Sequence, residues 1–91
     1  LIKPTNFDLE QNFPNPFNPT STIKYSVPER SLIRLSVYNT IGQEVALLVD
    51  EEKDAGDYSF EFNASGLTSG IYFYRLQSGN FVETRKMVLL R

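Results

Sequence analysis

Five carboxylates in the middle of the chain are the residues whose types and spacing best suit metal or acid–base chemistry: Asp50, Glu51, Glu52, Asp54 and Asp57. Calcium binds six to eight oxygen ligands, and the EF-hand loop requires glycine directly after its third ligand. Here Ala55 follows Asp54. A glycosidase needs two carboxylates across a substrate cleft, which neighbours on one loop do not build. We therefore interpret residues 50–54 as a solvated charged loop that also discourages edge pairing.

The residue types that are missing exclude more chemistry than the carboxylates suggest. The 91 residues include no His, Cys or Trp, which removes Cys and His nucleophiles and the usual zinc, haem and iron–sulfur ligand sets. The 9 basic and 11 acidic residues are spread along the chain, without the basic stripe that binds nucleic acid. No apolar run reaches the roughly 18 residues of a membrane-spanning segment. The composition favours one small domain that is not an enzyme and uses no cofactor.

Prolines and glycines divide the chain into two parts. All five prolines lie in the first 28 residues, and all five glycines follow residue 41. Proline favours an extended first part, whereas glycine permits tight turns in the second. Apolar residues alternate with polar ones between turn signals at 28–31, 39–42 and 78–80. This alternation predicts strands over residues 22–27, 33–37, 58–62, 70–76 and 81–90.

The segment 43–53 fits two structures. Ile41, Val45 and Leu48 recur at helical spacing among good helix formers. Residues 45–49 also alternate as in a strand. Strand signals on both sides favour a strand that ends before the charged loop. The rhythm of short strands and turns then predicts an all-β antiparallel sandwich or barrel.

Two short motifs near the fourth glycine have structural interpretations. The sequon at Asn63 fits N-glycosylation, but a three-residue match is common, and we prefer a turn role for this asparagine. Leu67, Gly70 and Tyr72 have the spacing of a tyrosine corner, in which a Tyr hydroxyl bonds back to the backbone of a β-sandwich. We therefore expect Tyr72 to stabilise the fold.

The run from Arg85 to Arg91 has two readings. Four apolar residues are bracketed by cations at the end of the given sequence. As structure, the run is a final strand whose Lys and Arg side chains blunt a sheet edge. As function, it is a terminal peptide that another protein reads by strand addition or carboxylate capture. The residues alone leave both readings open.

Five stretches occur in an order that is similar to one known family. They are the asparagine- and proline-rich residues 11–19, then 23–25, 37–45, 64–76 and 86–91. Together they resemble the type A C-terminal sorting domain of the type IX secretion system, which is found in Bacteroidetes and related bacteria.

The resemblance implies an immunoglobulin-like antiparallel β-sandwich of about seven strands over residues 7–91, with 1–6 as the end of a linker. It also implies an N-terminal cargo domain in the same chain and a signal peptide that delivers the precursor to the periplasm. The outer-membrane secretion machinery would then recognise the folded domain. A surface sortase commonly cleaves upstream, so the cargo would end at the cell surface or be secreted.

Site residues follow from the resemblance by matching position. The recognition element would be the last strand, which comprises Lys86, Met87, Val88, Leu89, Leu90 and Arg91. The fold positions would be Asn15, Pro16, Gly42, Val45, Gly70 and Tyr72. We expect the terminal strand and its flanking cations to dock on an acidic or edge-presenting receptor.

Two other functions remain open. The first is an accessory module that binds carbohydrate or cell wall through an exposed aromatic platform of Tyr38, Phe73 and Tyr74. The second is an assembly module similar to the immunoglobulin-like domain of flagellar hook-capping proteins.

Overall fold

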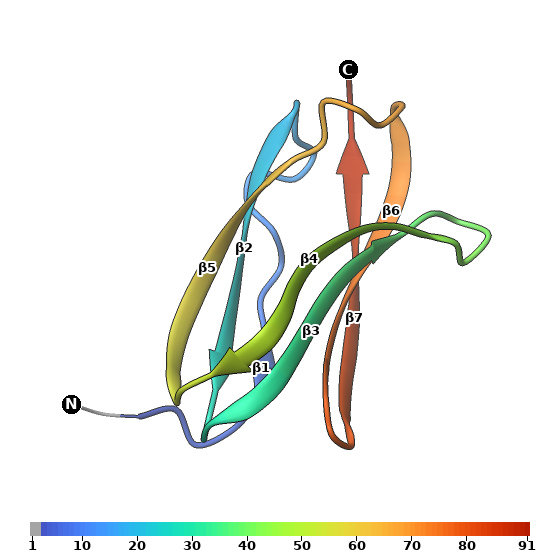
Figure 1. Cartoon of the computed structure of the whole chain (residues 1–91). Coiled ribbons are helices and arrows are strands. Elements are labelled where there is room, and N and C mark those ends of the chain that lie inside the picture. The colour runs from blue at the N-terminus through green and yellow to red at the C-terminus, as the bar shows by residue number, and fades with distance from the viewer. Residues whose placement is uncertain (1–2) are drawn as a thin grey trace.

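Alternation of apolar and polar residues gives each strand one face to bury, and two antiparallel sheets pack these faces together (Figure 1). The computed structural model describes residues 3–91. One sheet has the order β1-β2-β5 and consists of β1 (Asp8–Leu9), β2 (Thr20–Val27) and β5 (Gly56–Asn63). The other has the order β4-β3-β6-β7 and consists of β3 (Ser31–Tyr38), β4 (Glu44–Lys53), β6 (Gly70–Ser78) and β7 (Phe81–Leu89). The predicted β-sandwich of about seven strands is confirmed.

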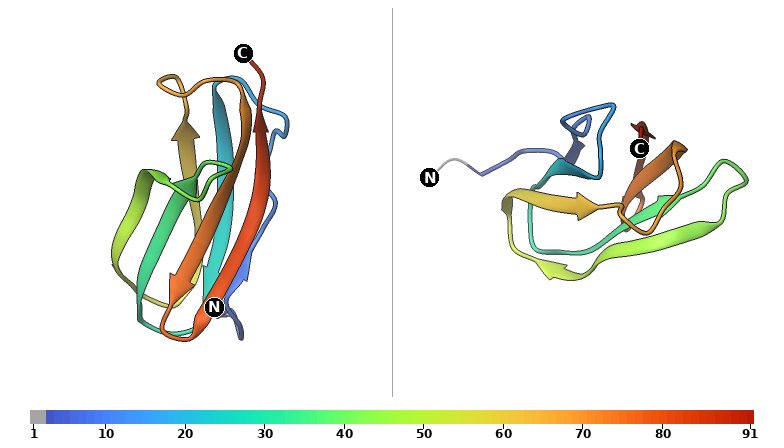
Figure 2. Two further views of the ribbon diagram at one scale, coloured as in Figure 1. Left: turned by 90° about the vertical axis from the view of Figure 1, so that its right-hand side faces the viewer. Right: turned by 90° about the horizontal axis from the view of Figure 1, so that it is seen from above.

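The chain changes sheet after β2, after β4 and after β5. The strand β4 therefore stays beside β3, whereas the fourth strand of an immunoglobulin constant domain joins the first sheet. Figure 2 shows the layers from the side and from above. In this immunoglobulin-like arrangement β7 forms one edge of the larger sheet and β4 forms the other.

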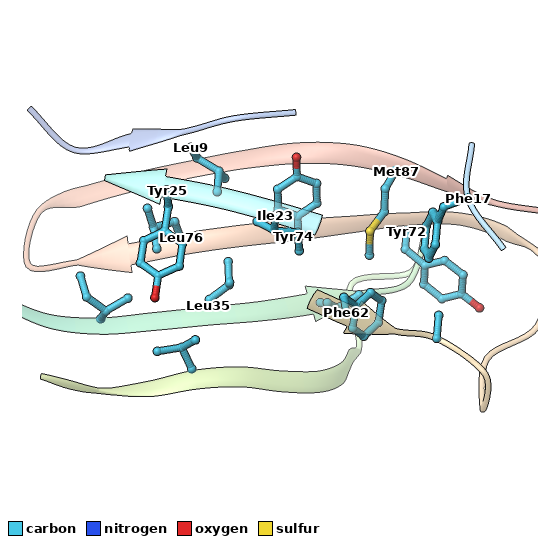
Figure 3. Close-up of a cluster of buried hydrophobic side chains, with 14 of the residues drawn as sticks. Leu9, Phe17, Ile23, Tyr25, Leu35, Phe62, Tyr72, Tyr74, Leu76 and Met87 are labelled. Atoms are coloured by element: carbon cyan, nitrogen blue, oxygen red, sulfur yellow. The ribbon is translucent and has the colours of Figure 1, made fainter. Parts of the chain in front are cut away.

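The inner faces of the two sheets form one hydrophobic core (Figure 3). Ile23 of β2 and Tyr74 of β6 are fully buried within it. Tyr72, Tyr74 and Leu76 share the inner face of β6, as their spacing predicts, whereas Ile71 lies on the outer face and is 43% exposed.

The strand β4 runs further than predicted. In place of a charged loop at 50–54, β4 continues to Lys53 and pairs with β3, so that Arg34 lies opposite Asp50 and Ser31 opposite Lys53. The loop prediction was wrong because a partner strand supplies ladder hydrogen bonds whatever the side chains are, and an edge strand facing water tolerates charge.

Residues 3–91 contain no helix, so the strand prediction for 43–49 holds over the helical alternative. Among these residues nothing long and apolar enough to cross a membrane as a helix is found. The predicted turn at 39–42 also forms. The Asn39 side-chain oxygen accepts hydrogen bonds from the N–H groups of Ile41 and Gln43, and Gly42 takes a φ of +84°, which favours glycine.

The chain between β1 and β2, residues 10–19, is called the proline strap below. Tyr74 holds it against the core. The Tyr74 hydroxyl donates to the Glu10 carbonyl at 2.6 Å and accepts from the Asn12 N–H at 2.7 Å. Asn12 is itself buried, and its amide nitrogen donates to the Ser21 hydroxyl at 2.9 Å. These buried polar groups therefore have partners, as stability requires.

Replacing Tyr74 with Phe removes both hydrogen bonds and leaves the Asn12 N–H and the Glu10 carbonyl without that partner. We expect the free energy of unfolding to fall by about 1–3 kcal/mol, measured from urea denaturation. Tyr38→Phe is the control, since its hydroxyl shares a single hydrogen bond, with the Ser36 hydroxyl at 3.2 Å, and no backbone group depends on it. Equal stability of the two variants would contradict this role for Tyr74.

Stability should also depend on alkaline pH. Burial raises the pKa of Tyr74 to about 12, and burial, aided by the nearby Tyr58, raises that of Tyr25 to about 12. In the unfolded chain both phenols ionise near pH 10, so the unfolded state binds fewer protons above that pH. The stabilisation is complete below about pH 10 and is lost as pH rises through about 12. Denaturation midpoints over this window should fall, and fall less in Tyr74→Phe.

Candidate functional site

The predicted recognition element lies on β7 and is divided by the strand's alternation into two rows. The inner row, Met87 and Leu89, is fully buried in the core. The outer row consists of Lys86, Val88 and Leu90, of which Lys86 is exposed, Val88 is partly exposed and Leu90 is 55% exposed. Among residues 86–90, only the outer row is therefore accessible to a receptor while the domain stays folded, and Arg91, which follows them, is also exposed.

The outer edge of β7, on the side away from β6, is covered by the proline strap, which runs beside β7 in Figure 2. The Phe17 N–H donates to the Val88 carbonyl at 3.0 Å, and the Leu90 N–H donates to the Phe17 carbonyl at 3.0 Å. Phe17 thus extends the larger sheet by one parallel bridge, and its ring is buried in the core.

Two polar side chains of the strap form hydrogen bonds with further backbone groups on the outer edge of β7. The Asn15 side-chain oxygen accepts from the Val88 N–H at 2.9 Å, and the Gln11 side-chain nitrogen donates to the Lys86 carbonyl at 2.7 Å. Pro16 lies between the two contacts that the strap makes through Asn15 and Phe17. The edge of β7 from Lys86 to Leu90 is consequently occupied, and adding a partner strand there would require displacement of the strap.

The guanidinium group of Arg91 is bound within the domain. Its Nη1 donates to the carbonyls of Ser65 at 2.7 Å and Leu67 at 2.8 Å, and lies 3.3 Å from that of Ala64. The Arg91 N–H donates to the Ser69 hydroxyl at 2.9 Å. Arg91 therefore fastens the end of the last strand to the loop between β5 and β6.

The same loop contains the predicted tyrosine corner. The Tyr72 hydroxyl donates to the Thr68 carbonyl at 2.7 Å, as the spacing predicts. Gly70 begins β6 with a φ of +151°, which side chains rarely adopt. Asn63 takes the preferred turn role, because its side-chain oxygen accepts from the Ser65 N–H at 2.9 Å.

Val45, the remaining predicted fold position, lies outside the core. The pairing of β3 with β4 shifts register between Val37 and Tyr38, and Val45 lies at this irregularity with 36% of its surface exposed. A second register shift lies between Leu35 and Ser36. Because β-bulges re-aim side chains, Val45 and Leu47 are exposed although Val49, in the same alternation, is buried.

The carboxylates of residues 50–54 form ion pairs at and beside the β4 edge. Arg34 lies 2.7 Å from Glu44 and 3.6 Å from Asp50. Arg30 lies 2.6 Å from Asp54 and 3.6 Å from Glu52. Hydrogen bonding to these carboxylates, with their negative charge, raises the pKa of Arg30 and Arg34. Exposed pairs of this kind contribute little stability.

The aromatic platform of the carbohydrate-binding alternative does not form. Tyr74 is fully buried on the inner face of β6, whereas Phe73 points to the outer face. The Tyr38 ring is covered by the Arg75 guanidinium, 4.5 Å from the ring centroid. Phe73 lies opposite Tyr38 on the outer face, so these two rings are neighbours, whereas Tyr74 lies on the other face and cannot complete a three-ring platform.

Sequence reasoning missed the contacts of Gln11 and Phe17 with β7. Gln11 lies 75 residues from its partner Lys86. No local periodicity carries information about such a distant contact. The available signal was the proline-rich strap itself, whose polar and aromatic residues lie between prolines. The backbone groups of such a segment must find partners outside it, which indicates a contact with another part of the chain.

Together the fold and the site define a small accessory β-sandwich whose proline-rich first part and basic last strand form one unit. A family model described as "Secretion system C-terminal sorting domain" matches residues 11–90. The chain belongs to this family, the sorting domains of type IX secretion. The match begins at Gln11 and ends at Leu90, two residues that join the strap to β7. The domain is thus a secretion sorting signal, which implies a cargo region before it, contact with secretion machinery, and a surface or secreted fate.

No curated protein and no solved structure matches the chain.

The role of the strap is testable by hydrogen exchange. Asn15→Ala removes the acceptor of the Val88 N–H, so we expect that amide to exchange about five- to tenfold faster by NMR. The Met87 amide, which faces β6, is the internal control and should keep its rate. An unchanged Val88 rate would show that Asn15 does not protect the edge.

Arg91 and Lys86 should differ in their effect on stability. Arg91→Ala removes the hydrogen bonds to the loop carbonyls, and we expect the free energy of unfolding to fall by about 1 kcal/mol. Lys86→Ala removes an exposed side chain and should stay within about 0.5 kcal/mol of the parent. Urea denaturation of both variants measures the difference, and a greater loss with Lys86→Ala would reverse the assignment.

Proposed function

We propose that this domain directs an N-terminal cargo protein across the bacterial outer membrane through the type IX secretion machinery. In this proposal a signal peptide first brings the precursor to the periplasm, where the domain folds. The machinery then recognises the outer row of β7. The observation that carries the proposal is the family match together with a last strand that is bonded to the strap along its edge and keeps Lys86, Val88 and Leu90 accessible.

The shape of the domain supports this proposal, because it separates the attachment point of the cargo from the end of β7. The chain enters the sandwich at the end opposite to the one where β7 finishes, and the longest extent is 39 Å (Figure 1). Cargo attached before β1 would therefore lie away from the end of β7. A receptor can then contact the last strand without meeting the cargo.

Cleavage by a surface sortase is part of the same proposal. The Phe7 ring stacks on Phe81 with ring centroids 4.9 Å apart, so packing against the sandwich begins at Phe7. Residues 3–6 precede it without a strand, and Leu1 and Ile2 lie outside the described residues. We place the cleavage point in this linker, 1–6, or before it.

A gain-of-export experiment tests the function. Residues 1–91 are fused behind a signal peptide and a fluorescent cargo in a host with the secretion system. We expect cargo at the cell surface or in the medium, and cargo without the domain should stay in the periplasm. The same fusion in a host that lacks the outer-membrane machinery is the second control. Periplasmic retention of the fusion in the competent host, or export without the machinery, would contradict the proposal.

Deletion of residues 86–91 is a weaker test. It removes Met87 and Leu89 from the core, and cavities of this size cost about 2–5 kcal/mol each. Loss of export would then report unfolding as well as loss of a signal. Substitutions on the outer row avoid this ambiguity.

A further inference from the structure

The pairing of β6 with β7 brings five side chains together on the outer face of the larger sheet. Ile71 lies opposite Val88, and Phe73 lies opposite Lys86. The edge groups of Val88 bond to the strap and not to β6, so these are non-hydrogen-bonded pairs, whose side chains approach most closely. Leu90 continues the row beyond Val88. We call this set, Ile71, Phe73, Lys86, Val88 and Leu90, the terminal patch.

The terminal patch is apolar and carries one cation. Ile71 is 43% exposed and Leu90 is 55% exposed. Within residues 3–91, Lys86 has no carboxylate within ion-pair distance, whereas the neighbouring Arg85 lies 3.2 Å from Glu83. The terminal patch itself contains no acidic residue. Its chemistry is complementary to an apolar protein surface that presents a carboxylate opposite Lys86.

Most of the outer-edge backbone groups beside the terminal patch are already bonded. Strand addition needs a row of unpaired N–H and carbonyl groups, and the strap binds the Lys86 carbonyl, both backbone groups of Val88 and the Leu90 N–H. A partner can therefore reach the side chains of β6 and β7 but not their ladder. This favours docking on the face of the sheet over strand addition, which was one of the modes that the sequence left open.

We propose that the secretion machinery recognises the terminal patch, with Ile71 and Phe73 of β6 contributing to binding alongside the outer row of β7. The partner surface is apolar and bears a carboxylate that pairs with Lys86. This inference rests on the proposed function and extends it from the last strand to a two-stranded face. Arg91 acts as a positioning residue, because it holds the end of β7 in place and its guanidinium is bound to the preceding loop.

Paired substitutions in the fluorescent-cargo fusion test the proposal. Ile71→Ser combined with Leu90→Ser should lower the exported fraction at least tenfold. The matched control combines Val82→Ser and Leu32→Ser, which are 54% and 60% exposed on the same sheet but lie outside the terminal patch. The control should export as the parent does. Urea denaturation of each variant identifies any loss of stability, and export is compared only between variants of equal midpoint.

A charge reversal tests the proposed carboxylate. Lys86→Glu should lower export at least tenfold, whereas Lys24→Glu, an exposed reversal on β2, should leave export unchanged. Parent-like export of both Lys86→Glu and the Ile71/Leu90 double variant would overturn the inference while leaving the proposed function intact. Failure of the parent fusion to export would instead overturn the proposed function.

A second copy of the domain is the alternative occupant. Sedimentation of the purified parent domain and of the Ile71/Leu90 double variant separates the two. We expect both to be monomeric. A parent dimer that dissociates on substitution would show that the terminal patch is a self-association surface, which contradicts docking on the machinery.

Discussion

The contact between the proline strap and β7 is the interaction on which the rest of the structure depends. A last strand at a sheet edge exposes unpaired backbone groups, which invite pairing with other chains. Phe17 pairs with this edge through its backbone, and Asn15 and Gln11 bond to it through their side chains. Tyr74 fixes the strap from inside the core. The first and last parts of the family pattern are therefore one structural feature.

The contact between the strap and β7 also limits which parts of the last strand another protein can recognise. Because Met87 and Leu89 fill the core, the last strand does not act as a detachable peptide. The side chains that a receptor can contact are those of the outer row and the β6 side chains beside it. A receptor that contacts this face tests whether the sandwich has closed, since the face exists only when β6, β7 and the strap are assembled. Under the proposed docking, the receptor would therefore bind the folded domain and not the unfolded chain.

The opposite edge of the larger sheet, strand β4, is protected against pairing in a different way. Within the described chain, β4 pairs with β3 alone, and Arg30 and Arg34 form ion pairs with its carboxylates Glu52 and Glu44. Charges on an edge strand disfavour pairing with other proteins. One edge is therefore covered by the chain itself, and the other is protected by charge. The residues that first suggest metal chemistry have this structural role.

How much was predictable depended on how far apart the interacting residues lie. Alternation over a few residues placed β2, β3, β5, β6 and β7 to within two residues at each end, but did not predict β1. The turn at Gly42 followed from its own residues. The end of β4 was mispredicted, because Ser31 of β3 decides how far that strand extends. The register shifts of β4, near which Val45 and Leu47 are exposed, are not revealed by alternation. The tyrosine corner was found because Tyr72 and Thr68 are only four residues apart.

The sequence by itself determined the all-β class, the absence of His and Cys chemistry and the resemblance to a sorting domain. These depend on composition, on a period of two and on motif order, which are local or additive properties. Only the tertiary structure decided which side chains of the last strand face outward, that its edge is covered, and that Arg91 is bound within the domain. The reason is physical. Alternation states which residues share a face, but the packing of segments more than 70 residues apart decides which face is buried.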